Sequence, residues 1–212
     1  MPELPEIETV CRGLSTVLKG ATFHDVVVRQ RQLRFPIPQT FRKKLLLRSI
    51  IRVYRRAKYF LFELDNGAVL IGHLGMSGRM AIYKIGEHIP APTPHDHVDF
   101  LFDRGILVRY SDPRRFGAMT LTHIEDLEDH KLLRNLGPEP LGRDFNDGVL
   151  VDRLKERKTS IKLALLDQRT LSGMGNIYVC ESLFRSGISP KRKAMNVKGK
   201  RAERLVKSIK DV

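Results

Sequence analysis

The spacing of apolar residues changes near residue 124 from a strand-like to a helical pattern, and this change restricts the possible folds more than any other feature. Before it, eight short strand-like segments follow one another: 22–29, 49–55, 58–65, 68–74, 79–84, 97–103, 106–111 and 118–123. After it, the helical segments are 125–134, 147–157, 160–168, 176–186 and 199–211. Strands followed by helices predict an α+β protein with two domains.

The strand-rich part is expected to form an N-terminal β-sandwich, because many short antiparallel strands at close spacing are typical of sandwiches and barrels. Asn66-Gly67 between two apolar runs is a strong hairpin signal, and Asp103-Arg104-Gly105 is a second such signal. Residues 5–19 read as an amphipathic helix that ends near Gly20. Residues 86–96, rich in Pro and His, read as a loop.

A linker at Gly137-Pro138-Glu139-Pro140 lies close to the change in pattern, and we place the domains at 1–130 and 131–212. Net charge is +14, and it is uneven. Residues 131–212 hold 19 Lys and Arg against 9 Asp and Glu, whereas residues 1–130 hold 19 against 15. A basic C-terminal half indicates a polyanionic partner, most often nucleic acid.

No apolar run approaches the roughly 20 residues that span a bilayer, and the acidic N-terminus does not resemble a secretory signal. We therefore expect a cytoplasmic protein without a membrane partner. The two cysteines, Cys11 and Cys180, form no paired spacing, so no disulfide framework or zinc site is expected.

Pro2 is the first candidate for chemistry. If Met1 is removed, Pro2 carries a free secondary amine, and an α-amino group titrates near ~8, so much of it is unprotonated at cellular pH. A secondary amine that attacks an aldehyde carbon gives an iminium ion, and Glu3 can move protons for it. The alternative is that Pro2 and Glu3 only begin a helix.

Residues 169–178 suggest a helix–two-turn–helix element, in which Gly173 and Gly175 turn the chain and Asn176 opens a helix. Backbone N–H groups at such a turn suit a phosphate, and Lys162 lies just upstream. A plain helix-to-helix turn is the alternative.

Two further turns could enter a base stack. Asp112 to Gly117 contains Arg114 and Phe116, and His73 to Gly78 carries Met76 between glycines. An aromatic ring or a flexible Met can insert between base steps while an arginine fills the vacated space. Both could equally be buried at ordinary turns.

Lys58 precedes a strand in a cluster of cations and is a candidate for a contact to phosphate or to a transition state. The His95-Asp96-His97 triplet lacks a third metal ligand at a useful spacing, which favours a phosphate contact by His95.

Together these segments resemble the bacterial formamidopyrimidine-DNA glycosylase family. The matching stretches, in the family's order, are 2–6 with Glu8-Thr9, 55–59, 73–78, 95–99, 112–117, 136–141 and 175–178. The resemblance implies a base-excision repair enzyme that flips an oxidised purine, such as 8-oxoguanine or a formamidopyrimidine, out of duplex DNA. It also implies a Schiff base at the N-terminal proline, followed by β- and δ-elimination at the abasic site.

The resemblance assigns roles residue by residue. Pro2 is the nucleophile, Glu3 the general acid and base, and Lys58 an assistant in β-elimination. Contacts to DNA are implied for His95, Arg114, Arg157 and Asn176, and Met76, Arg114 and Phe116 are implied to fill the gap left by the flipped base. We also expect His73 and Lys162 to contact DNA.

The family ends in a four-cysteine zinc finger that these 212 residues lack, so we expect no metal in this chain and zinc in a longer parent. The last predicted helix runs to Val212, which favours a C-terminal truncation. We expect a monomer that acts on nucleoid DNA in a bacterial cytoplasm.

Two alternatives remain open. A catalytically impaired DNA-binding fragment would bind lesion and undamaged duplex alike, with a steep dependence on salt. An RNA-binding β-barrel would need aromatic residues clustered on its strands, yet aromatic residues make up only 7% of the chain.

Overall fold

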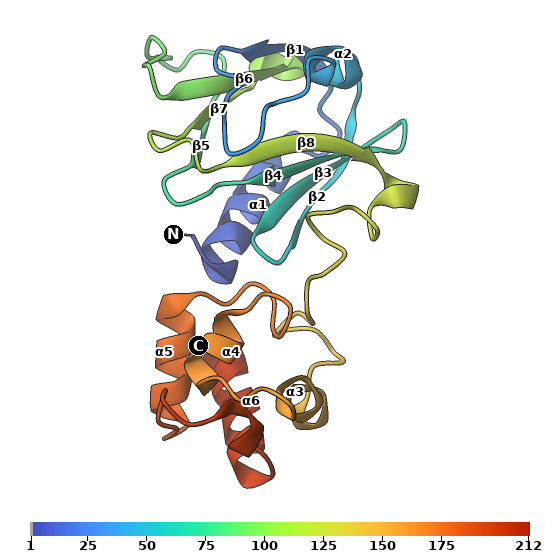
Figure 1. Cartoon of the computed structure of the whole chain (residues 1–212). Helices are drawn as coiled ribbons and strands as arrows, with labels where there is room; N and C mark the ends of the chain where they lie inside the picture. Colours follow the sequence, from blue (N-terminus) through green and yellow to red (C-terminus); the bar gives the residue numbers. More distant parts are fainter. Residues whose placement is uncertain (1) are drawn as a thin grey trace. The chain divides into compact units, whose positions relative to one another are not determined.

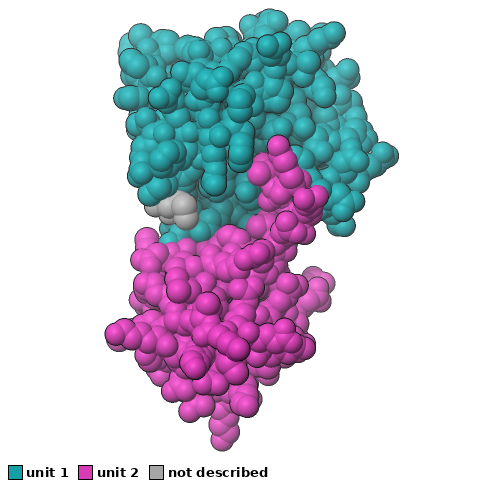
Figure 2. Space-filling model, in the orientation of Figure 1, with its two compact units in different colours: residues 1–130 teal, residues 131–212 magenta. Residues whose placement is uncertain are grey.

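The computed structural model describes residues 2–212 and divides the chain into two units that meet in sequence between His130 and Lys131 (Figures 1 and 2). Each unit has its own apolar core. The first contains every β-strand assigned in the described residues, and the second contains helices and turns.

Unit 1 holds two four-stranded antiparallel sheets, in the orders β1-β6-β7-β5 and β2-β3-β4-β8. The strands are β1 (Phe23–Val28), β2 (Ile50–Arg56), β3 (Tyr59–Leu64), β4 (Ala68–His73), β5 (Arg79–Tyr83), β6 (Asp96–Phe102), β7 (Leu107–Ser111) and β8 (Ala118–His123). Large side chains such as Phe60, Phe62 and Phe100 are fully buried in the core of this unit. The predicted N-terminal β-sandwich and α+β class are confirmed.

Helix α1 (Leu4–Leu18) lies against β2 and β3. Ile7, Leu14 and Leu18 fall on its buried face at helical spacing and join the same core as the sheets. Burial of this face fixes the helix in place, and the helix in turn fixes the N-terminal residues that precede it.

Unit 2 is built from α3 (Asp147–Leu154), α4 (Ile161–Leu166), α5 (Asn176–Arg185) and α6 (Lys200–Asp211). Asn146 and Ser160 cap the first two helices, since their side-chain oxygens accept the N–H groups of Val149 and Leu163. Helix α6 packs on α3 and α5, and α4 packs on α5.

Most predicted elements are present, with two differences. The helix predicted over 125–134 is wrong, because only a single 3₁₀ turn at Ile124–Asp126 forms and turns follow it. Leu133 is the one buried residue of that segment, and a short helix without a packed face is unstable in water. The five-residue helix α2 (Phe41–Leu45) was not predicted, since it is too short to show a period.

The hairpin predicted at Asn66-Gly67 joins β3 to β4, and Gly67 has the positive φ of 78° that the turn requires. Within residues 2–212 no helix is both long and apolar enough to cross a membrane. Cys11 is buried and Cys180 is exposed, and both thiols are free. Burial raises the pKa of Cys11 to about 12.

Candidate active site and nucleic-acid interface

The topology of unit 1 brings three connections to one end of the sheet β2-β3-β4-β8. The two-residue turn of Ala57 and Lys58 joins β2 to β3, and Tyr59 at the start of β3 pairs with His73 at the end of β4. His73 in turn pairs with Ala118, the first residue of β8. The turn at Lys58 and the loops 74–78 and 112–117 therefore share this edge.

The start of α1 holds Pro2 and Glu3. Pro2 is half-buried, and Glu3 is only 3% exposed. The Glu3 N–H donates to Glu6 Oε2 at 2.9 Å, which completes one half of a capping box. This box fixes the backbone directly after Pro2. Met1, whose removal the chemistry requires, lies outside the described residues.

Lys58 is buried beside this helix start, with an exposure of 6%. Burial lowers the pKa of Lys58, and the negative charges of Glu3 and Glu6 oppose that shift. Arg55 holds the turn in place, because its guanidinium donates to Glu8 on α1 at 3.2 Å and to the Ala57 carbonyl at 2.9 Å. A lysine whose pKa is lowered by burial gives up its proton more readily than an exposed lysine does, which suits it to proton transfer.

His73 is a neutral group in this site. Burial lowers its pKa to about 4, and the charges of Arg34 and Lys58 act in the same direction. The Gly75 N–H donates to His73 Nδ1 at 2.9 Å, so Nε2 carries the proton and is a hydrogen-bond donor. The ring also lies 5.0 Å from that of Tyr59.

A cavity of about 760 Å³ opens beside His73. Met76 and Phe116 line it with exposures of 44% and 46%, so neither is the core residue that the alternative interpretation required. The guanidinium carbon of Arg114 lies 4.7 Å from the centre of the Phe116 ring. Arg34 also lines the cavity. Sequence reasoning missed Arg34, since it comes from an irregular loop without a recognisable motif.

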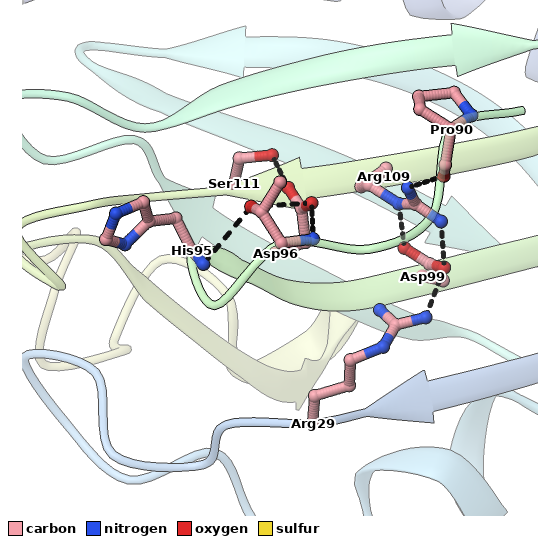
Figure 3. Close-up of polar contacts among 8 residues, drawn as sticks. Arg29, Pro90, His95, Asp96, Asp99, Arg109 and Ser111 are labelled. Atoms are coloured by element: carbon pink, nitrogen blue, oxygen red, sulfur yellow. Dashed lines mark hydrogen bonds and ion pairs between the residues drawn. The ribbon is translucent and has the colours of Figure 1, made fainter.

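His95 lies on an exposed turn at the start of β6, and Figure 3 shows how that turn is held. The His95 N–H donates to Thr93 Oγ1 at 3.3 Å, and the Thr93 N–H donates to Asp96 Oδ2 at 2.6 Å. Ser111 of β7 donates to Asp96 as well. The His95 carbonyl accepts the N–H of Asp112 at 2.9 Å, which ties this turn to the loop 112–117.

Asp99, four residues beyond His95, belongs to a structural ion-pair network (Figure 3). Burial raises the pKa of Asp99, but hydrogen bonds from Arg109 at 2.9 Å and Arg29 at 2.6 Å outweigh it and lower the pKa. Arg109 also donates to the Pro90 carbonyl at 2.7 Å, so the network anchors the 86–96 loop on β6 and β7.

In unit 2, Arg157 and Asn176 lie near the connection that joins α4 to α5. Arg157 donates to Asp167, the residue that ends α4, at 2.9 Å. Gln168 closes the connection, because it accepts the Gly173 N–H and donates to the Met174 carbonyl, both at 2.8 Å. Asn176 follows as the exposed first residue of α5.

Lys162 lies elsewhere in unit 2. It lines an apolar cavity of about 480 Å³ with Cys180, Phe184 and Pro190, beside the C-terminal half of α5. Cys180 also contacts Asn176, since its thiol lies 3.8 Å from Asn176 Oδ1.

The described residues offer no site for zinc. Among residues 2–212, no three His, Cys, Asp or Glu side chains form a group that could hold a metal ion. Cys11 and Cys180 belong to different units, and the Cys11 thiol donates to the Tyr54 carbonyl at 3.5 Å. The four-cysteine site implied by the resemblance has no counterpart in this part of the chain.

The model of the formamidopyrimidine-DNA glycosylase N-terminal domain matches residues 1–119, and the model of the formamidopyrimidine-DNA glycosylase H2TH domain matches residues 136–212. The chain belongs to the formamidopyrimidine-DNA glycosylase family. Among its relatives, the formamidopyrimidine-DNA glycosylase of Ruegeria pomeroyi is 48% identical over 217 residues, which span 100% of this chain and 77% of the relative. That of Rhodospirillum rubrum is 49% identical over 212 residues, which span 100% and 75%.

Solved structures agree with this family. The complex between the Lactococcus lactis Fpg and an abasic site containing DNA matches with a TM-score of 0.89 and 30% identity, over 99% of this chain and 76% of that one. The wild-type Lactococcus lactis Fpg (MutM) with a N7-benzyl-Fapy-dG containing DNA matches with a TM-score of 0.90 and 30% identity, over 99% and 77%. Membership of the formamidopyrimidine-DNA glycosylase family makes the chain a DNA glycosylase of base-excision repair.

Proposed function

We propose that this DNA glycosylase removes oxidised purines, 8-oxoguanine and formamidopyrimidines among them, from duplex DNA and then cleaves the abasic site. The observation that carries the proposal is the arrangement at the start of α1, where half-buried Pro2 precedes buried Glu3, with buried Lys58 in electrostatic contact. The similar Lactococcus lactis proteins were solved in complex with abasic DNA and with DNA that contains a formamidopyrimidine.

Pro2 acts as the nucleophile once Met1 is removed. Its amine nitrogen bonds to C1′ of the damaged nucleotide while the C1′–base bond breaks, and the N–H proton leaves. Opening of the sugar then breaks C1′–O4′ and leaves an iminium between Pro2 and C1′. The iminium draws electrons from C2′, so loss of a C2′ proton expels the 3′ phosphate.

Glu3 and Lys58 move protons in these steps. Glu3 directly follows the nucleophile and is held by the capping box, so it protonates O4′ as the sugar opens. Lys58 has a lowered pKa and assists the proton loss of β-elimination. A second elimination then releases the 5′ phosphate.

The exposed side chains of the cavity stabilise the distorted duplex. Met76 and Phe116 enter the base stack, and Arg114 faces the orphaned cytosine, whose acceptors its guanidinium donors can contact. His73 through its Nε2–H and His95 through its exposed ring contact phosphates.

Residues 1–130 serve as the catalytic domain and residues 131–212 as a helix–two-turn–helix DNA-binding domain, in which Arg157, Lys162 and Asn176 contact the backbone. The excess of positive charge in the second domain supports this division. We propose that the protein works as a monomer on the nucleoid DNA of a bacterial cytoplasm, without a membrane partner. Sedimentation of the free and DNA-bound chain tests the monomer.

Borohydride trapping tests the chemistry. The chain is incubated with two duplexes, one with an abasic site and one with 8-oxoguanine opposite cytosine, and the adduct is mapped by mass spectrometry. We expect adducts on both duplexes, linked to Pro2. An adduct on a lysine, or trapping that survives acetylation of the N-terminus, would refute the role of Pro2.

The same experiment separates the alternatives. Trapping on the abasic duplex alone means that the nucleophile works but lesion capture does not. No trapping on either duplex, with removal of Met1 verified, means that the chain binds DNA without catalysis.

A further inference from the structure

Two loops carry the residues that enter the base stack, and one buried carboxylate joins them. The loop 74–78 follows β4 and bears Met76, and the loop 112–117 follows β7 and bears Arg114 and Phe116. Asp112 lies beneath both with an exposure of 0%.

The two carboxylate oxygens of Asp112 accept four hydrogen bonds. Oδ1 accepts from Ser77 Oγ at 2.6 Å and from the Arg114 N–H at 3.3 Å. Oδ2 accepts from the Gly117 N–H at 2.8 Å and from the Tyr110 hydroxyl at 3.1 Å. Of these donors, Ser77 alone belongs to the loop of Met76.

Ser77 is a bridge between the loops, because its hydroxyl oxygen also accepts the Arg114 N–H at 3.3 Å. Direct backbone contact reinforces the bridge. A Cβ on Gly75 would lie 2.5 Å from the Phe116 carbonyl carbon and 2.6 Å from the Gly117 nitrogen. The loops are therefore in contact through backbone alone at this point.

The backbone of Asp112 extends the same network. Its N–H donates to the His95 carbonyl at 2.9 Å, and its carbonyl lies 2.7 Å from His97 Nε2. A carbonyl oxygen can only accept, so the Nε2 of His97 carries the proton. One residue thus contacts the His95 turn and both loops.

We propose that Asp112 is a positioning residue, linked through Ser77, that holds the two loops as one rigid wedge before DNA arrives. Met76, Arg114 and Phe116 then enter the duplex in a single step, with the ordering of the loops already complete in the free protein. Hydrogen bonds from neutral donors to a carboxylate are stronger than those between two neutral groups, so they can hold the loops in one arrangement. The inference rests on the proposed function.

The test compares two variants, each of which removes one hydroxyl group that donates a hydrogen bond to Asp112. Ser77→Ala removes the hydroxyl bridge between the loops and leaves their backbone contact, whereas Tyr110→Phe removes a bond of similar kind from β7 and leaves the bridge intact. We measure the dissociation constants of each variant for a duplex with a tetrahydrofuran abasic analogue and for undamaged duplex. Discrimination is the dissociation constant for undamaged duplex divided by that for the abasic-analogue duplex. Ser77→Ala is expected to lower this ratio about tenfold, and Tyr110→Phe is expected to change it less than twofold.

Rescue and coupling give a second readout. Ser77→Thr keeps the hydroxyl and should restore discrimination.

In the wild-type chain, Met76→Ala and Phe116→Ala together should cost little more affinity for the abasic-analogue duplex than the larger single loss, because the wedge acts as one unit. In the Ser77→Ala chain the fold-losses of affinity from Met76→Ala and Phe116→Ala should multiply, as they do for independent sites. Equal effects of Ser77→Ala and Tyr110→Phe, or multiplying losses in the wild-type chain, would overturn the proposal.

Borohydride trapping on an abasic duplex separates this proposal from the function on which it rests. Trapping by Ser77→Ala at the wild-type level, with discrimination unchanged, refutes the rigid wedge and leaves the role of Pro2 standing. Loss of trapping in the wild-type chain refutes the proposed chemistry instead.

Discussion

The two units differ in one respect, because unit 1 buries some of its candidate residues and unit 2 buries none of its own. In unit 1, Glu3 and Lys58 are 3% and 6% exposed, and burial shifts the pKa values of Lys58 and His73. In unit 2, Asn176 is exposed, and Arg157 and Lys162 are half-buried. Bond chemistry needs groups whose protonation is set by the protein, whereas binding of a polyanion needs charges that remain in water. The buried groups of unit 1 therefore suit a reaction, whereas its exposed residues, such as Met76 and Phe116, suit binding as those of unit 2 do.

The largest effect expected from this comparison is on the reaction. Glu3→Gln should slow base release about a thousandfold, since it removes a general acid and base, while binding of an abasic-analogue duplex changes less than threefold. Single-turnover rates and titrations measure the two quantities. Glu8→Gln, a carboxylate on the same helix that pairs with Arg12 and Arg55, is the control and should retain most of the rate. A tenfold loss or less in Glu3→Gln would place Glu3 outside the reaction.

The second effect is on stability, and it belongs to unit 1 alone. The pKa of His73 is about 4 in the folded chain against an ordinary value of 6.5, so the unfolded chain binds more protons between these values. The stability that His73 contributes is complete above pH 6.5 and is lost as the pH falls toward 4, by about 3 kcal/mol at most. All seven histidines precede residue 131, so unit 2 has none that titrates in this range.

Native-state hydrogen exchange at several pH values measures the two units within the intact chain. The unfolding free energy of β3 and β4 should fall between pH 6.5 and 4, and that of α5 and α6 should stay nearly constant. His73→Asn keeps an acceptor for the Gly75 N–H without a titrating ring and should flatten the response of unit 1. An equal fall in both units would show that the effect does not come from His73.

A third effect concerns discrimination. Arg114→Ala should weaken binding to a lesion opposite cytosine about tenfold to a hundredfold, because a paired set of guanidinium bonds to a base is lost. Binding to undamaged duplex should change about twofold, since no orphaned base is present to contact. Competition titrations with the two duplexes measure the ratio. Equal losses on both would remove Arg114 from the wedge.

The smallest effect is expected in unit 2. Lys162→Ala should weaken lesion and undamaged duplex alike, by about fivefold, and reduce the slope of log K against log salt by about one. If Lys162→Ala leaves the salt slope unchanged, the apolar cavity that Lys162 lines is not part of the DNA surface.

Local signals in the sequence were enough for most elements but not for all. The turn residues Asn66 and Gly67 predicted a hairpin correctly, because the required φ is a property of the residues themselves. The apolar residues of 125–134 suggested a helix that does not form, because its stability depended on packing that the tertiary structure does not provide. Helix α2 is the reverse case, because it is too short to show a period in the sequence. The tertiary structure buries its Phe41 and Leu45, and this packing stabilises the helix.

For the site, motifs indicated which segments matter and not how they are held. The exposure of Met76 and Phe116 decided between a wedge and a core, and only the structure gives it. The sequence shows Asp112 only as the first residue of a turn motif. Its role as a shared acceptor is not visible there, because its four donors come from residues up to 35 positions away. Arg34 carried no signal at all. Their roles in the reaction remain predictions for the experiments above.

The two cysteines give the chain a built-in route to labelling. Cys11 is buried with a pKa of about 12, so it stays a protonated thiol at neutral pH, and Cys180 on α5 is open to solvent. A maleimide dye should therefore attach at Cys180 alone, without any cysteine having to be replaced. A single fluorophore on α5 would report from the helical unit as the chain scans a DNA molecule, one protein at a time.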